Sequence, residues 1–194
     1  MRIFAIVSVS LTLLALVAFV RYGRGGYESP EYRVVVDEGS FQVREYPSMV
    51  LATTPMSGPG REDGESFMRL FGYISGGNAA GAKISMTTPV FMSGEGEGGR
   101  MGFVVPRETA AQGAPAAAGP EIRIEPMPGG RFAAYRFSGR RDPEARARAR
   151  RKLESWIREQ GLEADGPPIV AGYDPPFIPP FLRRNEVLFR LIGS

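Results

Sequence analysis

The order of predicted elements after residue 26 constrains the fold of this chain more than any other feature. Each half is expected to run strand, strand, helix, strand, strand, and corresponding elements lie roughly 80 to 86 residues apart without sequence identity. Two such units bury their helices against one face of antiparallel strands. The sequence therefore predicts an α+β fold, a distorted antiparallel β-barrel made of two similar halves with two flanking helices.

Hydrophobic periodicity gives the elements of the first half. Residues 32–56 alternate between apolar and polar positions, which predicts two or three strands. Apolar residues at spacings of three and four then predict a helix over residues 62–74. Residues 84–92 and 101–105 follow as a predicted hairpin, joined by a glycine-rich turn.

Residues 106–120 separate the halves and are rich in Ala, Pro and Gly, so we expect a mobile surface linker. In the second half, a helix is expected to begin with Asp142 as N-cap and Pro143 in its first position, and to end at Gly161. Its predicted buried residues are Ala145, Ala149, Leu153, Trp156 and Ile157. The predicted strands around this helix are residues 121–125, 131–137, 169–173 and 187–192.

The N-terminal segment differs from the rest of the chain because residues 3–20 contain no charged side chain. As a helix this stretch spans roughly 27 Å, which is just enough for a hydrocarbon core of about 30 Å. We therefore expect residues 1–26 to form an N-terminal transmembrane anchor or signal segment, and residues 27–194 to form one domain. A short N-terminus with a single Arg ahead of an apolar run is typical of secretory entry, which favours an extracytoplasmic domain.

Composition excludes several kinds of chemistry. The chain has no Cys and no His, so disulfides and thiolates are excluded, as are the commonest metal ligand and the commonest general base. The net charge is +3, and the densest basic cluster lies on the second predicted helix at Arg146, Arg148, Arg150, Arg151 and Lys152. No aromatic residues are interleaved with it, so we interpret it as a solvated face of a monomeric domain without a nucleic-acid partner.

Residues 174–182 form an unusual apolar segment in which four prolines prevent pairing as a central strand. This segment is expected either to fold over its own core as a lid or to form the stiff wall of a ligand cleft. The first helix allows a similar choice, because Phe67, Met68 and Phe71 continue a stripe that begins at glycines. That stripe either leaves room for a flat ligand or is a frayed first turn.

Four ordered motifs resemble those of one known family. They are Tyr73–Asn78, Lys83–Val90, Ala171–Pro176 and Arg183–Val187. Together they are similar to the SOUL haem-binding protein family over residues 28–192. The resemblance implies a distorted barrel of two similar halves flanked by two long helices, in agreement with the periodicity.

The resemblance also implies a haem or tetrapyrrole site in an apolar surface cleft between the first helix and the loop before the last strand. At those positions this chain has Phe67, Phe71, Tyr173, Phe177 and Ile178. Since the chain has no His, iron must be held by Tyr or Met, by solvent, or by no protein atom.

Three further side chains complete the predicted site. Met68 lies on the same helix stripe as Phe67, while Arg61 and Arg69 are the candidates for orienting the propionates. Tyr173 is a weak candidate for the axial ligand, because a phenolate suits ferric iron.

We therefore expect a module without enzymatic activity that binds haem or a related tetrapyrrole for storage, transport or buffering. One alternative is a gyrase-inhibitor-like domain that binds a small-molecule effector, or a hydrolase, and either one needs a cleft carboxylate from Glu65 or Glu186. Another is a membrane-surface protein without a ligand, in which Phe177 and Phe181 fill the core.

Overall fold

The computed structural model describes residues 26–56, 64–94 and 98–193. The predicted membrane segment, residues 3–20, lies outside these ranges. Within them, no helix is both long enough and apolar enough to cross a membrane.

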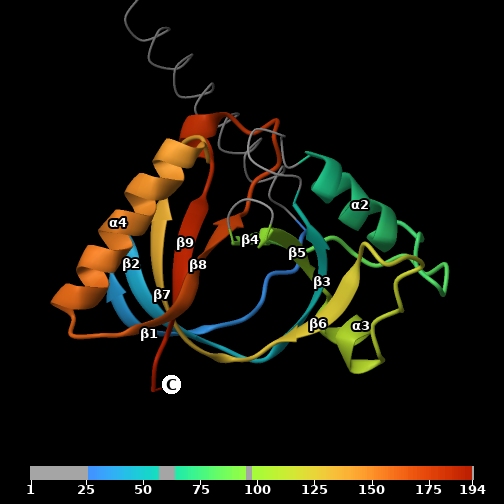
Figure 1. Ribbon diagram of the computed structural model, residues 1–194, viewed down its shortest axis with the longest axis horizontal. Helices are drawn as coiled ribbons and strands as arrows, with labels where there is room; N and C mark the ends of the chain where they lie inside the picture. The colour runs from blue at the N-terminus through green and yellow to red at the C-terminus, as the bar shows by residue number, and fades with distance from the viewer. Residues whose placement is uncertain (1–25, 57–63, 95–97, 194) are drawn as a thin grey trace, which may run out of the picture.

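Nine antiparallel strands form one strongly curved sheet (Figure 1). Their order across the sheet is β1-β2-β7-β9-β8-β4-β5-β3-β6, so β1 and β6 are the two edges and the sheet is not closed. The predicted barrel is therefore corrected to an open, curved sheet. The strands are β1 (Arg33–Glu38), β2 (Phe41–Tyr46), β3 (Met49–Pro55), β4 (Val90–Ser93), β5 (Arg100–Val104), β6 (Arg123–Met127), β7 (Gly130–Phe137), β8 (Ala164–Gly172) and β9 (Asn185–Leu191).

The two predicted halves are present, and each one contributes a strand to the other. The elements β2, β3, α2 (Gly64–Ile74), β4 and β5 correspond in order to β6, β7, α4 (Pro143–Glu159), β8 and β9. The first strand of each half pairs with the second strand of the other half: β2 pairs with β7, and β6 pairs with β3. The halves meet where β4 pairs with β8.

Helix α4 has the boundaries that its sequence predicts. The Asp142 side chain accepts a hydrogen bond of 2.8 Å from the Ala145 amide, and Pro143 is the first helical residue. Gly161, just beyond the helix, has a φ of +64°, which glycine adopts without steric cost. The residues that α4 buries against β7 and β9 are Ala149, Leu153, Trp156 and Ile157, whereas Ala145 is only half-buried.

Two predictions about irregular segments were wrong. The strand predicted from residue 84 begins only at Val90, because the Ile84 amide bonds to the Ile74 carbonyl and Pro89 has no amide hydrogen. Residues 106–120 are not an unstructured linker. They contain the short helix α3 (Arg107–Ala111), and the Pro115 carbonyl accepts a hydrogen bond of 2.7 Å from the Tyr73 hydroxyl.

Candidate functional site

Helix α2 carries two kinds of apolar side chain. Leu70, Tyr73 and Ile74 are buried against the sheet, because they recur at the helical spacing that faces β3 and β5. Met68 and Phe71 instead remain 60% and 43% exposed. They are two of the predicted site residues on this helix.

Phe67 connects these two faces of the helix. Its ring lies nearly parallel to that of Phe71, with centroids 6.2 Å apart and an interplanar angle of 12°, and meets Phe103 of the core edge-on. Phe71 is therefore supported from behind by an aromatic ring that is itself fixed to the sheet.

The proline-rich loop between β8 and β9 divides its apolar residues between the core and the surface. Ile178 is fully buried, while Phe177 and Phe181 are 62% and 70% exposed. The exposure of both rings contradicts the alternative in which they fill the core. Ile178 anchors the loop from below and does not line its outer surface.

Hydrogen bonds to the start of β9 hold this loop. The Arg183 guanidinium donates to the carbonyls of Ile178 and Pro176 at 2.7 and 2.6 Å. The Asp174 carboxylate accepts a bond of 2.5 Å from the Arg184 amide. These bonds and the prolines fix the loop backbone, so Phe177 is presented on a stiff segment.

The two predicted propionate partners differ in what the structure says of them. Arg61 lies outside the described residues. Arg69 is directed at β3, where its guanidinium donates to the Thr54 hydroxyl at 3.1 Å and to the Pro55 carbonyl at 2.6 Å. These bonds engage Nε and one Nη nitrogen and hold the guanidinium against β3.

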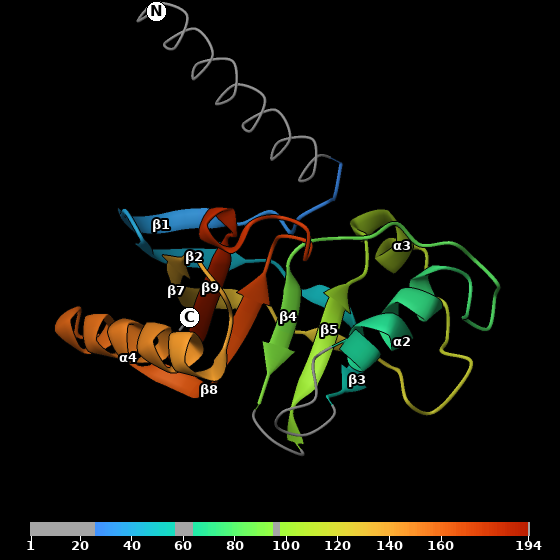
Figure 2. The ribbon, with the colours of Figure 1, turned by 90° about the horizontal axis from the view of Figure 1, so that it is seen from above.

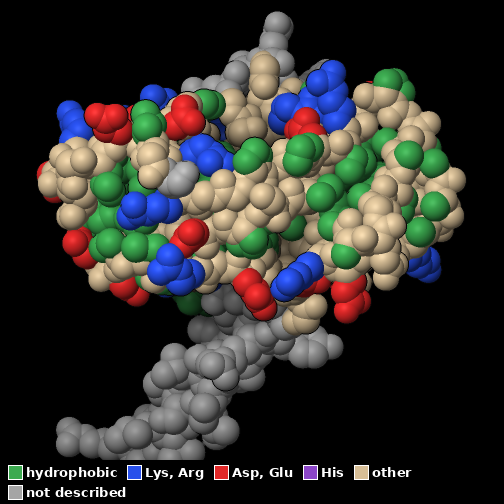
Figure 3. Space-filling model, turned by 90° about the horizontal axis from the view of Figure 1, so that it is seen from below, with side chains coloured by type: hydrophobic (Ala, Val, Ile, Leu, Met, Phe, Trp, Pro, Cys, Tyr) green, Lys and Arg blue, Asp and Glu red, His purple; other side chains and the backbone are tan. Residues whose placement is uncertain are grey.

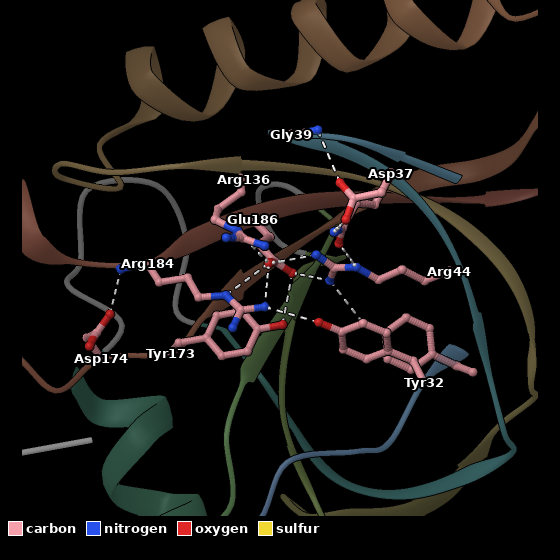
Figure 4. Close-up of polar contacts among 11 residues, drawn as sticks. Tyr32, Asp37, Gly39, Arg44, Arg136, Tyr173, Asp174, Arg184 and Glu186 are labelled. Carbon is pink, nitrogen blue, oxygen red and sulfur yellow. Dashed lines mark hydrogen bonds and ion pairs between the residues drawn. The ribbon is translucent and has the colours of Figure 1, made fainter. Parts of the chain in front are cut away.

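A buried cluster of charged and phenolic side chains lies beside the loop, on the concave face of the sheet (Figure 4). Arg44 of β2 and Glu186 of β9 are 1% and 0% exposed and form a paired contact with bonds of 2.6 and 3.0 Å. Arg184 donates twice more to Glu186, at 2.8 and 3.0 Å. The Tyr173 hydroxyl donates a fifth bond to the carboxylate, of 2.9 Å.

Burial and charge act against each other on Glu186. Burial alone raises the pKa of this carboxyl group, but the hydrogen bonds and charges of Arg44 and Arg184 outweigh it, so the Glu186 pKa is lowered. Glu186 is therefore ionised at neutral pH, and both its oxygens already accept hydrogen bonds. The arrangement fits a structural anion better than a general base.

The same cluster sets the state of Tyr173. Burial and the neighbouring Glu186 charge raise the Tyr173 pKa well above its ordinary value. The Arg184 guanidinium lies 4.0 Å from the centre of its ring. The hydroxyl therefore stays protonated, and it reaches an iron ion only after it leaves Glu186.

The carboxylates proposed for the alternative functions lie in different environments. Glu65 is exposed on the first turn of α2, whereas Glu186 is inside the fold. The effector-binding or hydrolase alternative thus has a carboxylate within the sheet, but one that is paired with three arginines, Arg44, Arg184 and, at 3.8 Å, Arg136. Among the described residues, no group of three Asp or Glu side chains is arranged to hold a metal ion.

Sequence reasoning missed Arg44, Tyr32 and Tyr46. Tyr46 lies beside Arg44, and burial raises its pKa to about 12, while the Tyr32 ring lies under the Arg44 guanidinium at 4.5 Å. The one available signal was an arginine in mid-strand at an inward-facing position, between Gln42 and Tyr46.

A cavity of about 1050 Å³ adjoins Tyr32 and Tyr46. Residues 28–33, the turn between β2 and β3, the end of β5 and α3 form its walls. None of the predicted haem-site residues within the described ranges lines it, so this cavity is separate from the exposed side chains of α2 and of the proline-rich loop.

Charged side chains of both signs are mixed on one face of the molecule. Figure 3 shows acidic and basic side chains lying side by side on the face seen from below, without a continuous basic surface there. A nucleic-acid interface of the groove-tracking type is continuously positive.

Comparison with solved structures shows the fold. The EcmrR C-terminal domain is 14% identical, with a TM-score of 0.53, and the match covers 82% of this chain and 97% of that domain. A hydrolase from Listeria innocua is 7% identical, with a TM-score of 0.57, over 81% of this chain and 94% of that one. No curated protein matches this chain.

The family is shown by a different comparison. The model of the SOUL heme-binding protein family matches residues 27–190, which is most of the chain. The match includes all four sequence motifs, α2 and the proline-rich loop. This chain therefore belongs to the SOUL haem-binding protein family.

Proposed function

We propose that this chain binds haem or a related tetrapyrrole on the apolar surface of α2 and the proline-rich loop, for storage, transport or buffering. One observation carries the proposal. Among the described residues, eight large hydrophobic side chains are exposed, and four of them, Met68, Phe71, Phe177 and Phe181, belong to these two elements. Half of the exposed large apolar side chains thus belong to two elements, and exposed apolar surface of this kind is a candidate interaction site.

The shape of these side chains favours a flat ligand. The parallel rings of Phe67 and Phe71 offer a planar apolar contact on one side, and the loop offers Phe177 on a fixed backbone. Both elements lie toward the upper end of the sheet in Figure 1. A macrocycle that contacts both elements gains apolar burial without ordering a mobile segment.

Iron contributes little to affinity in this proposal. The chain contains no His, and the Tyr173 hydroxyl is bonded to Glu186. Met68 is the one thioether on this surface. We therefore expect modest affinity that depends mainly on apolar contact and is shared by metal-free porphyrins.

A haemin titration of residues 27–194, followed by the Soret band, tests this proposal. Phe71→Ser combined with Phe177→Ser should weaken binding by more than about tenfold, since each ring contributes on the order of 1.5 kcal/mol or more when it is covered. The control is Ile192→Ser, which removes an equally exposed apolar side chain after β9. If the double variant binds as tightly as the control, or if the wild-type spectrum equals that of haemin with an unrelated protein, the proposal fails.

We also propose that residues 3–20 anchor the domain on the extracytoplasmic side of a membrane. The charge-free run and its single preceding Arg support secretory entry, whereas the positive-inside rule nearly cancels because Arg21 and Arg24 follow the run. Protease added to intact spheroplasts should digest the domain, and survival of the domain would contradict the proposed side.

A further inference from the structure

The convex face of the sheet is incompletely covered by its helices. Helix α4 packs over β7, β9 and part of β8, and α2 packs over β3 and β5. Figure 2 shows the two helices on the same side of the sheet, with β8 and β4 between them. A groove of about 550 Å³ lies along this uncovered seam, beside α4 and at the junction of the two halves.

The floor of the groove is apolar and rigid. Met92 of β4 and Val187 of β9 are 3% and 1% exposed, and Val170 of β8 lies half-buried between them. Pro167 and Pro168 lie where the pairing of β8 with β9 is interrupted, and they have no amide hydrogens to offer to a neighbouring strand. A ligand that covers this floor meets few polar groups that need new partners.

The wall formed by α4 is positively charged. Arg150 is paired with Glu154 at 2.7 Å, so these two side chains neutralise each other. Arg146 and Arg151 also line the groove, and within the described part of the chain neither guanidinium has a hydrogen bond or an ion pair. Two uncompensated positive charges therefore border an apolar floor.

We propose that this groove binds a small anionic amphiphile, of the class of long-chain carboxylates. Its carboxylate lies against Arg146 or Arg151, and its hydrocarbon part covers the accessible apolar lining at Pro167, Pro168 and Val170. A neutral amphiphile gains the apolar contact but leaves the arginines unpaired, and a cationic one is repelled by them. The groove shares no residue with the proposed tetrapyrrole surface, so this inference does not rest on that function.

The test uses the full chain in a non-ionic detergent and the fluorescent probe 11-(dansylamino)undecanoic acid, with the empty-micelle signal subtracted. The acid should bind with increased dansyl emission, and its neutral methyl ester should bind more weakly. Arg146→Ala combined with Arg151→Ala should weaken binding of the acid by about tenfold, which corresponds to the loss of one charge-assisted hydrogen bond. Binding of the ester should not change.

The matched control is Arg148→Ala combined with Arg158→Ala. Both side chains are exposed on α4 outside the groove, so this pair removes the same charge from the same helix. Equal weakening by the two double variants would attribute binding to general electrostatics and overturn the proposal. Absent binding of the acid, or equally tight binding of the ester, would also overturn it. A haemin titration of the groove variant should be unchanged, which separates this result from the proposed tetrapyrrole site.

Discussion

The buried pair of Arg44 and Glu186 permits a sharp test of what stabilises the curved sheet. Replacing Glu186 with Gln keeps the shape of the side chain and removes its charge. Arg44, which is 1% exposed, then keeps Gln42 and Tyr46 as hydrogen-bond acceptors, at 2.8 and 3.2 Å, together with one uncharged amide oxygen in place of two carboxylate oxygens. The amide nitrogen of the Gln side chain also points its N–H donors at the N–H donors of the Arg44 guanidinium. Glu186→Gln therefore leaves the buried Arg44 charge uncompensated.

The expected loss of stability in Glu186→Gln depends on how exposed its arginine partners are. Removing one member of a buried ion pair costs about 3 to 5 kcal/mol of the free energy of unfolding. Arg184 is 32% exposed and can turn toward solvent, so we expect the lower end of this range. Glu45→Gln is the control, because Glu45 pairs with Arg33 on the exposed side of β2 and should cost less than about 1 kcal/mol.

Urea denaturation of residues 27–194, followed by circular dichroism, measures both variants. A third variant, Arg44→Met with Glu186→Leu, removes both buried charges and should cost less than the sum of the single changes. A loss below about 0.5 kcal/mol for Glu186→Gln would refute the reasoning, since that is the range of ordinary surface substitutions.

Three other predictions concern the same elements. Folding lowers the Glu186 pKa, so the ionised carboxylate stabilises the fold above its unfolded pKa of about 4.3, and this stabilisation is lost as pH falls through the folded pKa. Urea denaturation between pH 7 and 3 should show this loss of stability. Glu186→Gln should make the loss smaller. Asp142→Ala should cost about 1 kcal/mol by removing the N-cap of α4, whereas Asp142→Asn should cost only a few tenths in the same assay. Tyr173→Phe should leave the ferric haem spectrum unchanged, because the hydroxyl is protonated and bonded to Glu186; a changed spectrum would instead identify Tyr173 as the iron ligand.

The parts of the fold that the sequence predicted well are those with local signals. Helix α4 combines Asp142, Pro143 and Gly161 at the positions where a helix begins and ends. The repeated order of elements was also readable, because each strand and helix has its own periodicity. The open form of the sheet could not be predicted in this way. Closure depends on where the edge strands β1 and β6 lie, and periodicity does not encode their position.

The candidate site also has parts that the sequence predicts from local signals and parts that it does not predict. Exposed Phe71 and Phe177 follow from a helical stripe and a proline-rich segment, both of which are visible in short windows of sequence. The buried cluster cannot be predicted from short windows of sequence. Arg44 and Glu186 are 142 residues apart and become partners only when β2 and β9 both pair with β7. The bonds of Arg69 were not predictable for a similar reason: its acceptors, Thr54 and Pro55, belong to another element.

The start of β9 connects the buried cluster to the proposed ligand surface. Arg183 and Arg184 lie just before β9; Arg183 bonds to the proline-rich loop, while Arg184 bonds to Glu186. Phe177 is thus presented by a loop that is bonded to two residues just before β9, and one of these, Arg184, belongs to the charge cluster in the interior. A stiff loop limits the entropy lost when a ligand binds. In the proposed tetrapyrrole site, which has no histidine ligand, this preorganisation would offset part of the affinity that an axial bond to iron would supply.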